Sequence, residues 1–271
     1  MKEMTFEETR MVQMEMLSAF HNFCAQNKLR YFLDHGTLLG AVRHEGFIPW
    51  DDDIDVGMPR DDYNKFIKLA GTGYDNSVLL LPENSIYSYL KILDKRTKLI
   101  EFPGKYRNEI GVYLDVFPKD GVPDMSYKGY LLCKTVHFLT LFYWFNKLSI
   151  YKWRNSSNIL KQLASFIGRL IMNDKLKYWP LKQTNKLVEK FKFDRSPYVA
   201  TVLANGLKNC VKRECFASFQ SVKFEELNLN IPVGYHEYLT ALYGDYMIPP
   251  PVEYQAKKHD YIAYWLADLT D

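Results

Sequence analysis

Four aspartates, Asp51, Asp52, Asp53 and Asp55, lie within five positions of the segment "IPWDDDIDVGM" at residues 48–58. Carboxylates this close raise one another's pKa and repel one another unless a cation lies between them. Mg²⁺ suits such a group, because it binds through one or two carboxylates and completes its coordination with water and substrate phosphates. The segment therefore predicts a site for a divalent cation.

The second half of this segment, from Asp53 to Met58, alternates between polar and apolar residues like a β-strand. On a strand, residues two apart share a face, with Cα atoms about 6.6–6.8 Å apart. Asp53 and Asp55 are thus expected to project to one side, whereas Ile54 faces a core and Asp52 points away. The alternation predicts that two carboxylates converge on one cation.

Other interpretations of the aspartates compete with a metal site. An acidic run is often a solvated loop, and the DxD motif of a nucleotide-sugar glycosyltransferase looks the same. In an EF-hand, Asp51, Asp53, Asp55 and Asp62 would fall at loop positions 1, 3, 5 and 12. Position 6 of that loop requires glycine and is Val56 here, which excludes an EF-hand.

Two motifs flank the aspartates. Upstream, "DHGTLLG" places Gly36 and Thr37 at the start of a short helix, whose free amides and dipole suit a phosphate. Downstream, "GVYLDVFP" places Asp115 in an apolar strand, either as an edge or capping residue or as a third carboxylate beside Asp53 and Asp55. A glycine turn, an alternating D-x-D strand and an acid on a later strand resemble the nucleotidyltransferase fold of the DNA polymerase β type.

A longer resemblance is carried by "HGTLLGAVRHEGFIPWDDDIDVGMPRDDY", then "LDVFPKDGVP", then "YHEYLTALYGDYMIPPP". These stretches resemble the LicD family of cytidine-diphosphate-dependent phosphotransferases, which includes bacterial phosphocholine transferases and relatives that transfer ribitol phosphate. The resemblance runs from about Tyr31 to Asp124 and resumes from about Phe224 to His259. The segment between them carries no family motif.

The resemblance implies roles for four acids. Asp53 and Asp55 would ligate Mg²⁺, or Mn²⁺ in its place, and Asp115 would be the third ligand. Asp51 would support them, and either Asp51 or Asp115 would accept the proton of the acceptor hydroxyl. The implied reaction is an in-line phosphoryl transfer, in which positioning and charge stabilisation supply most of the catalysis.

Nine residues near these motifs are predicted to bind substrate. Basic side chains that follow the glycine turn or flank an expected hairpin turn at "DKRT" can hold donor phosphates, although such charges are also common on solvated surfaces. Aromatic faces attract a quaternary ammonium; Tyr243 is a further candidate for such a cage, the alternative being that the aromatic residues pack in the core. In chain order the nine are Gly36, Thr37, Arg43, His44, Trp50, Lys91, Arg96, Tyr246 and His259.

Periodicity predicts an α+β fold, a small mixed sheet of the nucleotidyltransferase type with flanking helices and an inserted basic helical segment. Thr5 and Glu8 form a capping-box pattern before a helix at 6–28. Thr37 is expected to cap a short helix, and Gly71 to end an amphipathic one. Strands are expected in "YFLDHG" and at 53–58, 78–82, 89–93, 96–102, 111–117, 198–203 and 215–229, with further helices within 126–193 and at 234–243.

Charge divides the chain unevenly. Residues 126–195 carry 14 Lys and Arg against 3 Asp and Glu, whereas the remainder carries 21 against 29. A basic, aromatic helical segment is drawn to an anionic membrane surface; a solvated subdomain with a basic face is the alternative. No recognition motif supports nucleic-acid binding. We expect 1–125 to be the catalytic core, 126–195 an insertion facing membrane or acceptor, and 196–271 to complete the core and the active-site rim.

Composition sets the expected location. The charged N-terminus is unlike a signal peptide, and no apolar run reaches the roughly 18 residues of a spanning helix. The four cysteines lack CxxC spacing, which is typical of reduced thiols. We therefore expect a cytoplasmic protein, peripheral on the inner face of the cell membrane if the basic segment binds lipid.

Together these features predict an enzyme that transfers phosphocholine from CDP-choline to a hydroxyl of a lipid-linked or polymeric cell-envelope glycan, of the teichoic acid or lipopolysaccharide type, and releases CMP. The same chemistry with CDP-ribitol or CDP-glycerol is the first alternative. A DxD glycosyltransferase is the second. A catalytically silent, membrane-docked binding subunit is the third, although such a relative would be expected to have lost one of the acids.

Overall fold

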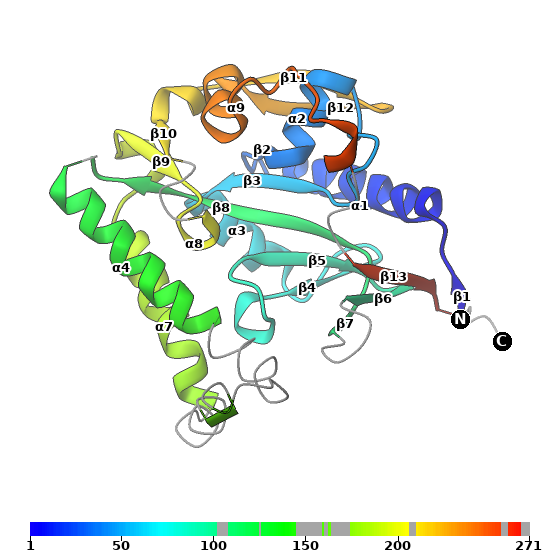
Figure 1. Ribbon diagram of the computed structural model, residues 1–271, viewed down its shortest axis with the longest axis horizontal. Helices are drawn as coiled ribbons and strands as arrows, with labels where there is room; N and C mark the ends of the chain where they lie inside the picture. The colour runs from blue at the N-terminus through cyan, green and yellow to red at the C-terminus, as the bar shows by residue number, and fades with distance from the viewer. Residues whose placement is uncertain are drawn as a thin grey trace.

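Strand β8 (Tyr113–Val122) is the centre of the fold, because all ten of its residues are buried and three strands pair with it. The computed structural model describes residues 1–101, 108–124, 126–144, 159, 162–163, 174–205, 210–255 and 260–266, and it is a mixed α+β structure (Figure 1). β3 (Asp55–Pro59) runs parallel to β8, whereas β5 (Leu90–Asp94) and β9 (Tyr198–Ala200) run antiparallel to it. β2 (Phe32–Leu33), β4 (Ser77–Leu80) and β10 (Val211–Lys212) complete this sheet of seven strands.

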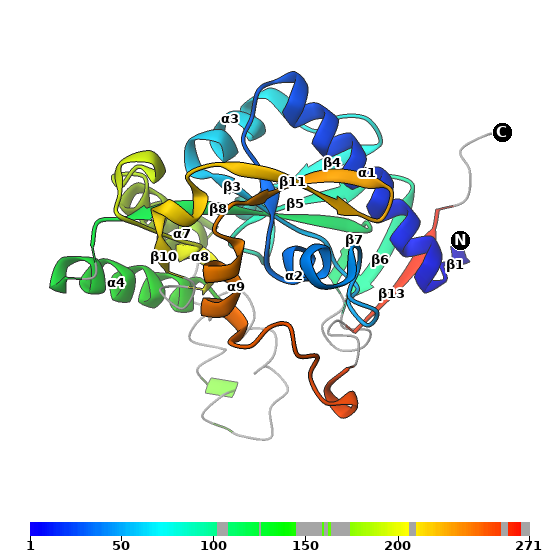
Figure 2. The same ribbon diagram turned by 90° about the horizontal axis from the view of Figure 1, so that it is seen from above.

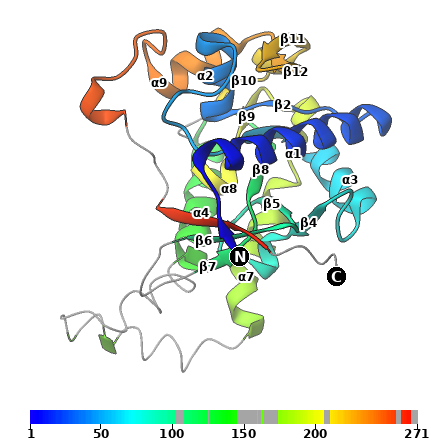
Figure 3. The same cartoon turned by 90° about the vertical axis from the view of Figure 1, so that its right-hand side faces the viewer.

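A second sheet joins segments that are far apart in the sequence. Its order is β1 (Lys2–Glu3), β13 (Tyr261–Trp265), β6 (Thr97–Glu101) and β7 (Asn108–Ile110). Figure 3 shows β13 beside β1. A separate antiparallel hairpin is formed by β11 (Phe219–Phe224) and β12 (Leu227–Pro232). The last described strand is thus held between the first strand and the middle of the chain.

Helices cover the central sheet where apolar side chains recur at helical spacing. α1 (Phe6–Gln26) begins at the predicted capping box of Thr5 and Glu8 and buries one face, including Leu17 and Phe20. Figure 2 shows α1 passing beside the β11–β12 hairpin, with α4 and α7 at the opposite end of the molecule from β13. The other helices near the aspartates are α2 (His35–His44), α3 (Arg60–Ala70) and α9 (Tyr235–Tyr243). Short 3₁₀ turns occupy Pro82–Asn84, Phe193–Arg195, Arg213–Phe216 and Val252–Tyr254.

Part of the basic segment forms a pair of packed helices. α4 (Tyr127–Trp144) and α7 (Asp174–Val188) lie against each other and close to α8 (Val202–Asn205). A small apolar cluster fills the space between them and β8 and β9; its buried members are Val122, Cys133, Val136, Val188, Ala200 and Val202. The helical prediction is confirmed for α4 and α7, whereas the predicted domain boundaries stay predictions. Within the described residues, no helix combines the length and the apolar character that crossing a membrane requires.

Five local predictions are wrong. The cap of α2 is Asp34 rather than Thr37, because the Asp34 carboxylate accepts the amide hydrogen of His35. The strand predicted from Asp53 begins at Asp55. The strand predicted at 198–203 ends at Ala200 and α8 follows, while the one at 215–229 is a 3₁₀ turn followed by a hairpin.

The predicted hairpin at "DKRT" is the fifth error. β5 pairs with β4 and β8, whereas β6 pairs with β13 and β7. Residues 95–96 therefore carry the chain from one sheet to the other. Turn residues mark where a chain reverses, but the partner of each strand is decided by long-range packing.

Candidate active site

Two neighbouring parallel strands bring the key acids together. Asp55 on β3 lies directly opposite Asp115 on β8, and Asp53 lies two residues before Asp55, where β3 begins. Carboxylate oxygens of these three residues lie within 4.8 Å of one another. Because carboxylate oxygens are the ligands that hard divalent cations prefer, the acidic cluster (Asp53, Asp55 and Asp115) has the donor set for Mg²⁺ or Mn²⁺.

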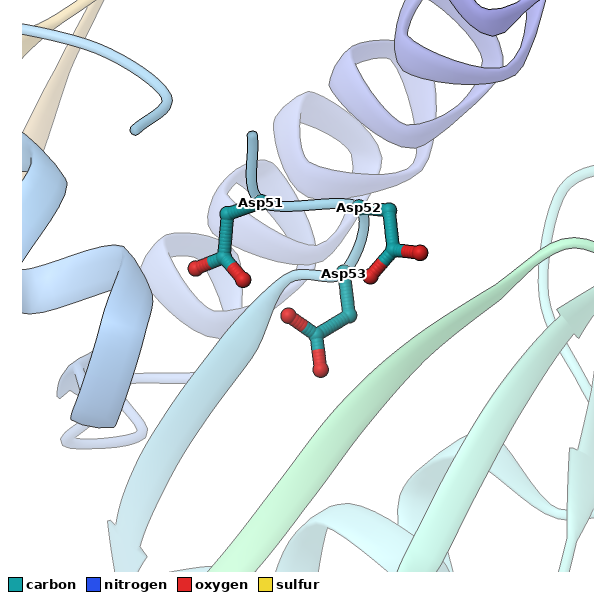
Figure 4. A group of neighbouring side chains, drawn as sticks. All are labelled: Asp51, Asp52 and Asp53. Carbon is teal, nitrogen blue, oxygen red and sulfur yellow. The ribbon is translucent and has the colours of Figure 1, made fainter. Parts of the chain in front are cut away.

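The turn before β3 adds two more acids beside this cluster. Figure 4 shows Asp53 between Asp51 and Asp52, and oxygens of these three also lie within 4.8 Å of one another. The prediction that Asp52 points away from Asp53 is wrong, since carboxylate oxygens of the two lie within 4.8 Å of each other, although Asp52 is not grouped with Asp55 and Asp115. The strand starts only at Asp55. Residues 51–53 lie between a turn and the strand, so their side chains need not alternate between two faces.

Helix α1 holds this turn through backbone carbonyls. An Arg10 guanidinium nitrogen donates to the carbonyl oxygens of Ile48 and Asp51 at 2.8 and 3.0 Å. The amide nitrogen of Gln13 donates to the carbonyl of Asp52 at 2.9 Å. These contacts bind α1 to the backbone of the acidic turn. Neither Arg10 nor Gln13 was singled out from the sequence, because a polar residue on a long helix gives no sign of the distant loop that it binds.

The start of α2 holds Asp55 in place through its backbone. The Thr37 hydroxyl oxygen accepts the Asp55 amide hydrogen at 2.8 Å, and the Asp34 amide donates to the Asp55 carbonyl at 3.0 Å. Gly36 and Thr37 are both buried. A Cβ atom at Gly36 would overlap a carboxylate oxygen of Asp51, so glycine is needed for α2 to approach the aspartates.

Lys91 neutralises Asp115. Its ammonium lies 2.8 and 3.0 Å from the two carboxylate oxygens of Asp115, and only 2% of Lys91 is exposed. The same ammonium lies 3.3 Å from the ring centroid of Tyr113 and 4.4 Å from that of Tyr87. Lys91 is therefore an interior residue of β5 beside the acidic cluster, rather than a solvated charge at a turn.

Burial and mutual repulsion make the acidic cluster receptive to a cation. Burial, then Asp53 and Asp115, raise the pKa of Asp55 well above its ordinary value. Burial likewise raises the pKa of Asp115 to about 6, although Lys91 partly offsets this. A divalent cation relieves such repulsion, because it favours the charged form of every carboxylate around it. The residues present thus fit the predicted metal.

Four predicted substrate-binding residues come together at the far end of α2. Arg43 donates to the carbonyl of Tyr246 at 2.7 Å, and the His44 and Trp50 rings meet edge to face at 6.4 Å. The Tyr246 hydroxyl bonds to His236 at 2.9 Å, and this tyrosine is buried. They form a group that joins α2 to the turn after α9, and their contact with substrate stays a prediction.

One other predicted residue, Arg96, lies in a different charged group. Arg96 pairs with Asp94 and with Glu15 of α1, both at 2.7 Å, and therefore belongs to a different charged group from the acidic cluster. His259 lies outside the described residues.

Two tyrosines near the cluster were not among the nine predicted residues. Tyr89 is half-buried and its ring lies 4.4 Å from that of Phe117. Burial first, then Asp115 and Asp55, raise the pKa of Tyr89. Burial first, then Asp55, also raise the pKa of Tyr243, which is 42% exposed. Tyrosines are so numerous in this chain that no spacing distinguishes these two.

Comparison with known proteins identifies the family of this chain. The profile of a family described as "LicD/FKTN/FKRP, nucleotidyltransferase domain" matches residues 28–135, which include every acid of the cluster. The lipopolysaccharide cholinephosphotransferase LicD of Haemophilus influenzae is 32% identical over 278 residues, which cover 98% of this chain and 100% of that protein. The ribitol 5-phosphate transferase FKRP of Homo sapiens is 46% identical over 43 residues, or 16% of this chain and 9% of that protein.

A shorter match is 40% identical over 55 residues to an uncharacterised protein of Rickettsia typhi, covering 20% of this chain and 18% of that protein. The similarity to the Haemophilus protein is of a different kind, since it extends over almost every residue of both chains. The chain therefore belongs to the LicD family of phosphotransferases.

Proposed function

We propose that this protein transfers phosphocholine from CDP-choline to a hydroxyl of a cell-envelope glycan, of the lipopolysaccharide or teichoic acid type, in an Mg²⁺-dependent reaction that releases CMP. The observation that carries the proposal is the acidic cluster on two adjacent parallel strands, inside the region matched by the family. The name of the relative that matches the whole chain supports choline phosphate as the transferred group.

The proposal includes a nucleotidyltransferase-like fold. Its support is the arrangement around β3: a short helix precedes the strand, two acids lie at its start, and a third acid lies opposite on β8. When bound, the cation would neutralise the pyrophosphate and polarise the phosphoryl group that is transferred. Asp53, Asp55 and Asp115 would hold it.

The proton of the acceptor hydroxyl needs a base. In the reaction the acceptor oxygen bonds to the phosphorus that carries choline, the bond from that phosphorus to the bridging oxygen breaks, and CMP leaves with that oxygen. Both oxygens of Asp115 are engaged by Lys91, which makes this carboxylate a poor proton acceptor. Asp51 is our choice for the base. Its carboxylate lies beside that of Asp53 and against Gly36 at the start of α2.

A lipid-linked acceptor would bring the protein to the inner face of the membrane. The exposed face of α4 supports this part of the proposal, because Tyr127, Tyr130, Leu131 and Phe138 are each more than half exposed and recur at helical spacing. Lys134 lies on the same face. Aromatic residues with interspersed lysines are suited to an anionic lipid interface.

Ribitol phosphate is the second candidate for the transferred group, since the stretch matched by the human ribitol 5-phosphate transferase reaches 46% identity. To decide, ³¹P NMR would follow the protein with CDP-choline, CDP-ribitol, CDP-glycerol or UDP-sugars, with Mg²⁺ and a glycolipid extract. EDTA-sensitive CMP formation from CDP-choline is expected. CMP from another CDP donor would reassign the transferred group, and UDP release would indicate a glycosyltransferase.

A matched pair of variants tests the site in the same assay. Asp53→Asn is expected to abolish CMP formation with the fold intact, whereas Asp61→Asn, at an exposed ion pair with Lys192, is expected to retain it. Full activity of Asp53→Asn would overturn the metal-site assignment. Silence from every donor with the native protein would favour a non-catalytic binding role.

A further inference from the structure

A buried polar network lies behind the acidic cluster. The carboxylate of Asp34 is fully buried and accepts hydrogen bonds from the His35 amide at 2.9 Å and the Tyr238 hydroxyl at 2.7 Å. The ammonium of Lys119 lies 2.7 Å from its other oxygen. Lys119 also donates to Thr201 at 2.7 Å and to the Tyr238 hydroxyl oxygen at 2.6 Å. Lys119 and Tyr238 thus meet Asp34 from distant parts of the chain, and Thr201 joins them through Lys119.

The N-cap and first turn of α2, residues 34–37, connect this network to the acidic cluster. As described above, the Asp34 amide and the Thr37 hydroxyl bind the two polar backbone groups of Asp55. The turn itself is strained, since His35 has φ +42°, a left-handed value that is unfavourable for a residue other than glycine. The bond from the His35 amide to Asp34 holds the chain in that conformation.

We propose that Asp34, Lys119 and Tyr238 form a positioning network that sets the place of Asp55 and thereby the cation affinity of the acidic cluster. Through Tyr238, helix α9 from the C-terminal part of the chain helps to determine the geometry of a site whose carboxylates lie between residues 53 and 115. These three residues touch neither cation nor substrate. The inference rests on the proposed function only in that a divalent cation is the ligand of the cluster.

The chain offers a matched control on the same strand. Asp120 follows Lys119 on β8 and forms an equally buried ion pair with Arg60, at 2.7 Å. Side chains alternate along a strand, so Lys119 shares the face of Asp115 whereas Asp120 points to the opposite face, toward α3. A change at Asp120 therefore removes a buried ion pair without touching the turn that binds Asp55.

The first test uses the full-length protein and Mn²⁺, whose binding is measured by electron paramagnetic resonance of the free ion, beside the thermal midpoint of unfolding. Loss of a residue that orients a ligand typically costs about 10–100-fold in metal affinity; we expect this for Asp34→Asn. Asp120→Asn is expected to lower the thermal midpoint comparably, with Mn²⁺ affinity within about twofold of the native value because distant sites act independently.

A milder pair covers the case in which the carboxylate variants fail to fold. Tyr238→Phe removes one hydroxyl from the network and is expected to weaken Mn²⁺ binding by about tenfold. Tyr63→Phe removes the hydroxyl of another buried tyrosine, on α3, and is expected to leave it unchanged. Equal affinities in the two variants would overturn the positioning role. Absence of Mn²⁺ binding by the native protein would instead overturn the metal site, so the two failures are distinguishable.

Discussion

The acids of the cluster differ in how the protein supports them. Asp115 is paired with a buried ammonium through its side chain, whereas Asp55 is held through its backbone. Burying a charge is costly unless it is paired, so three carboxylates in one place would be strongly destabilising without Lys91 or a bound cation. Lys91 therefore reduces the repulsion among these carboxylates.

The first prediction concerns that lysine. Lys91→Met keeps much of the side-chain volume but removes the charge, and it is expected to destabilise the metal-free protein by about 3–5 kcal/mol, as breaking a buried ion pair does. Because a divalent cation can then take over the neutralisation, Mg²⁺ should raise the thermal midpoint of unfolding more in this variant than in the native protein.

Thermal unfolding with and without Mg²⁺ measures this difference. Lys192→Met, at the exposed pair with Asp61, serves as the control and should change neither quantity appreciably. An Mg²⁺-induced shift no larger in Lys91→Met than in the native protein would contradict the idea that the ammonium and the cation neutralise the same carboxylates.

The second prediction concerns pH and Asp34. Burial alone would raise its pKa, yet His35 and Lys119 hold the pKa well below the ordinary value of 3.8; Tyr238 and Asp55 also face it. The stabilisation from the charged carboxylate is thus fully present above pH 3.8 and is lost as the pH falls further. Asp34→Asn lacks this contribution at every pH.

Urea unfolding of both proteins between pH 7 and pH 3 tests the sign. The native protein should exceed Asp34→Asn by about 3–5 kcal/mol in free energy of unfolding near neutral pH, and the difference should narrow below pH 4. A difference that stays constant over the whole range would show that the charge of Asp34 does not stabilise the fold.

At the scale of the elements, the sequence predicted those whose signal is local. The structure confirms the two helices predicted from the capping box at Thr5 and from apolar periodicity, α1 and α3. The sequence also identified Asp53, Asp55 and Asp115 as acids that could lie together, because an alternating strand and a lone aspartate in an apolar strand can each be recognised within a few residues. Two of the failures depended on distant partners: the strands with which β5 and β6 pair, and the burial of Lys91. The cap of α2 is a local contact between Asp34 and His35 that was assigned to the wrong residue.

Lys119 on β8 is a further residue whose surroundings imply a buried ion pair. Lys119, the lysine in "LDVFPKD", stands in a strand whose ten residues are all buried, and a buried lysine requires an acidic partner. That partner is Asp34, which precedes Lys119 by 85 residues in the sequence. No local pattern identifies it, so the network behind the site required the structure.

The third prediction concerns α4. If its exposed aromatic face meets lipid, replacing Tyr130 and Phe138 together by Ser should weaken binding to phosphatidylglycerol vesicles by tenfold or more, since each buried aromatic side chain contributes roughly 1.5–3 kcal/mol. Cosedimentation with vesicles measures this. Leu69→Ser, an exposed apolar residue on α3, is the control, and equal binding of all three proteins would contradict the membrane-facing role.

At the scale of the whole molecule, β13 joins the parts of the fold. It pairs with β1 on one side and β6 on the other, and Met4 donates to the carbonyl of Ala263 at 2.8 Å. Tyr261 of the same strand lies near the acidic turn, with its hydroxyl 3.4 Å from the Asp52 carbonyl. The C-terminal strand therefore contributes to both the second sheet and the surroundings of the site.

The fourth prediction follows. Ala263 is buried on β13, whereas Leu266 just beyond the strand is 41% exposed. Ala263→Asp places an unpaired charge between strands and is expected to lower the free energy of unfolding by about 3 kcal/mol or more. Leu266→Asp should change it by less than about 0.5 kcal/mol. Urea unfolding of the two variants measures this difference. Equal losses of free energy of unfolding would contradict the central place of β13.

The hydrogen bond between Tyr238 and Asp34 spans 204 positions of sequence, and this separation has a consequence for biosynthesis. At about 5–20 residues per second, the aspartates leave the ribosome roughly 10–40 s before the tyrosine that supports them. During that interval the nascent chain displays its acidic turn without the partners from α9. Interrupted translation therefore yields fragments that contain every carboxylate of the site but lack the geometry to use them.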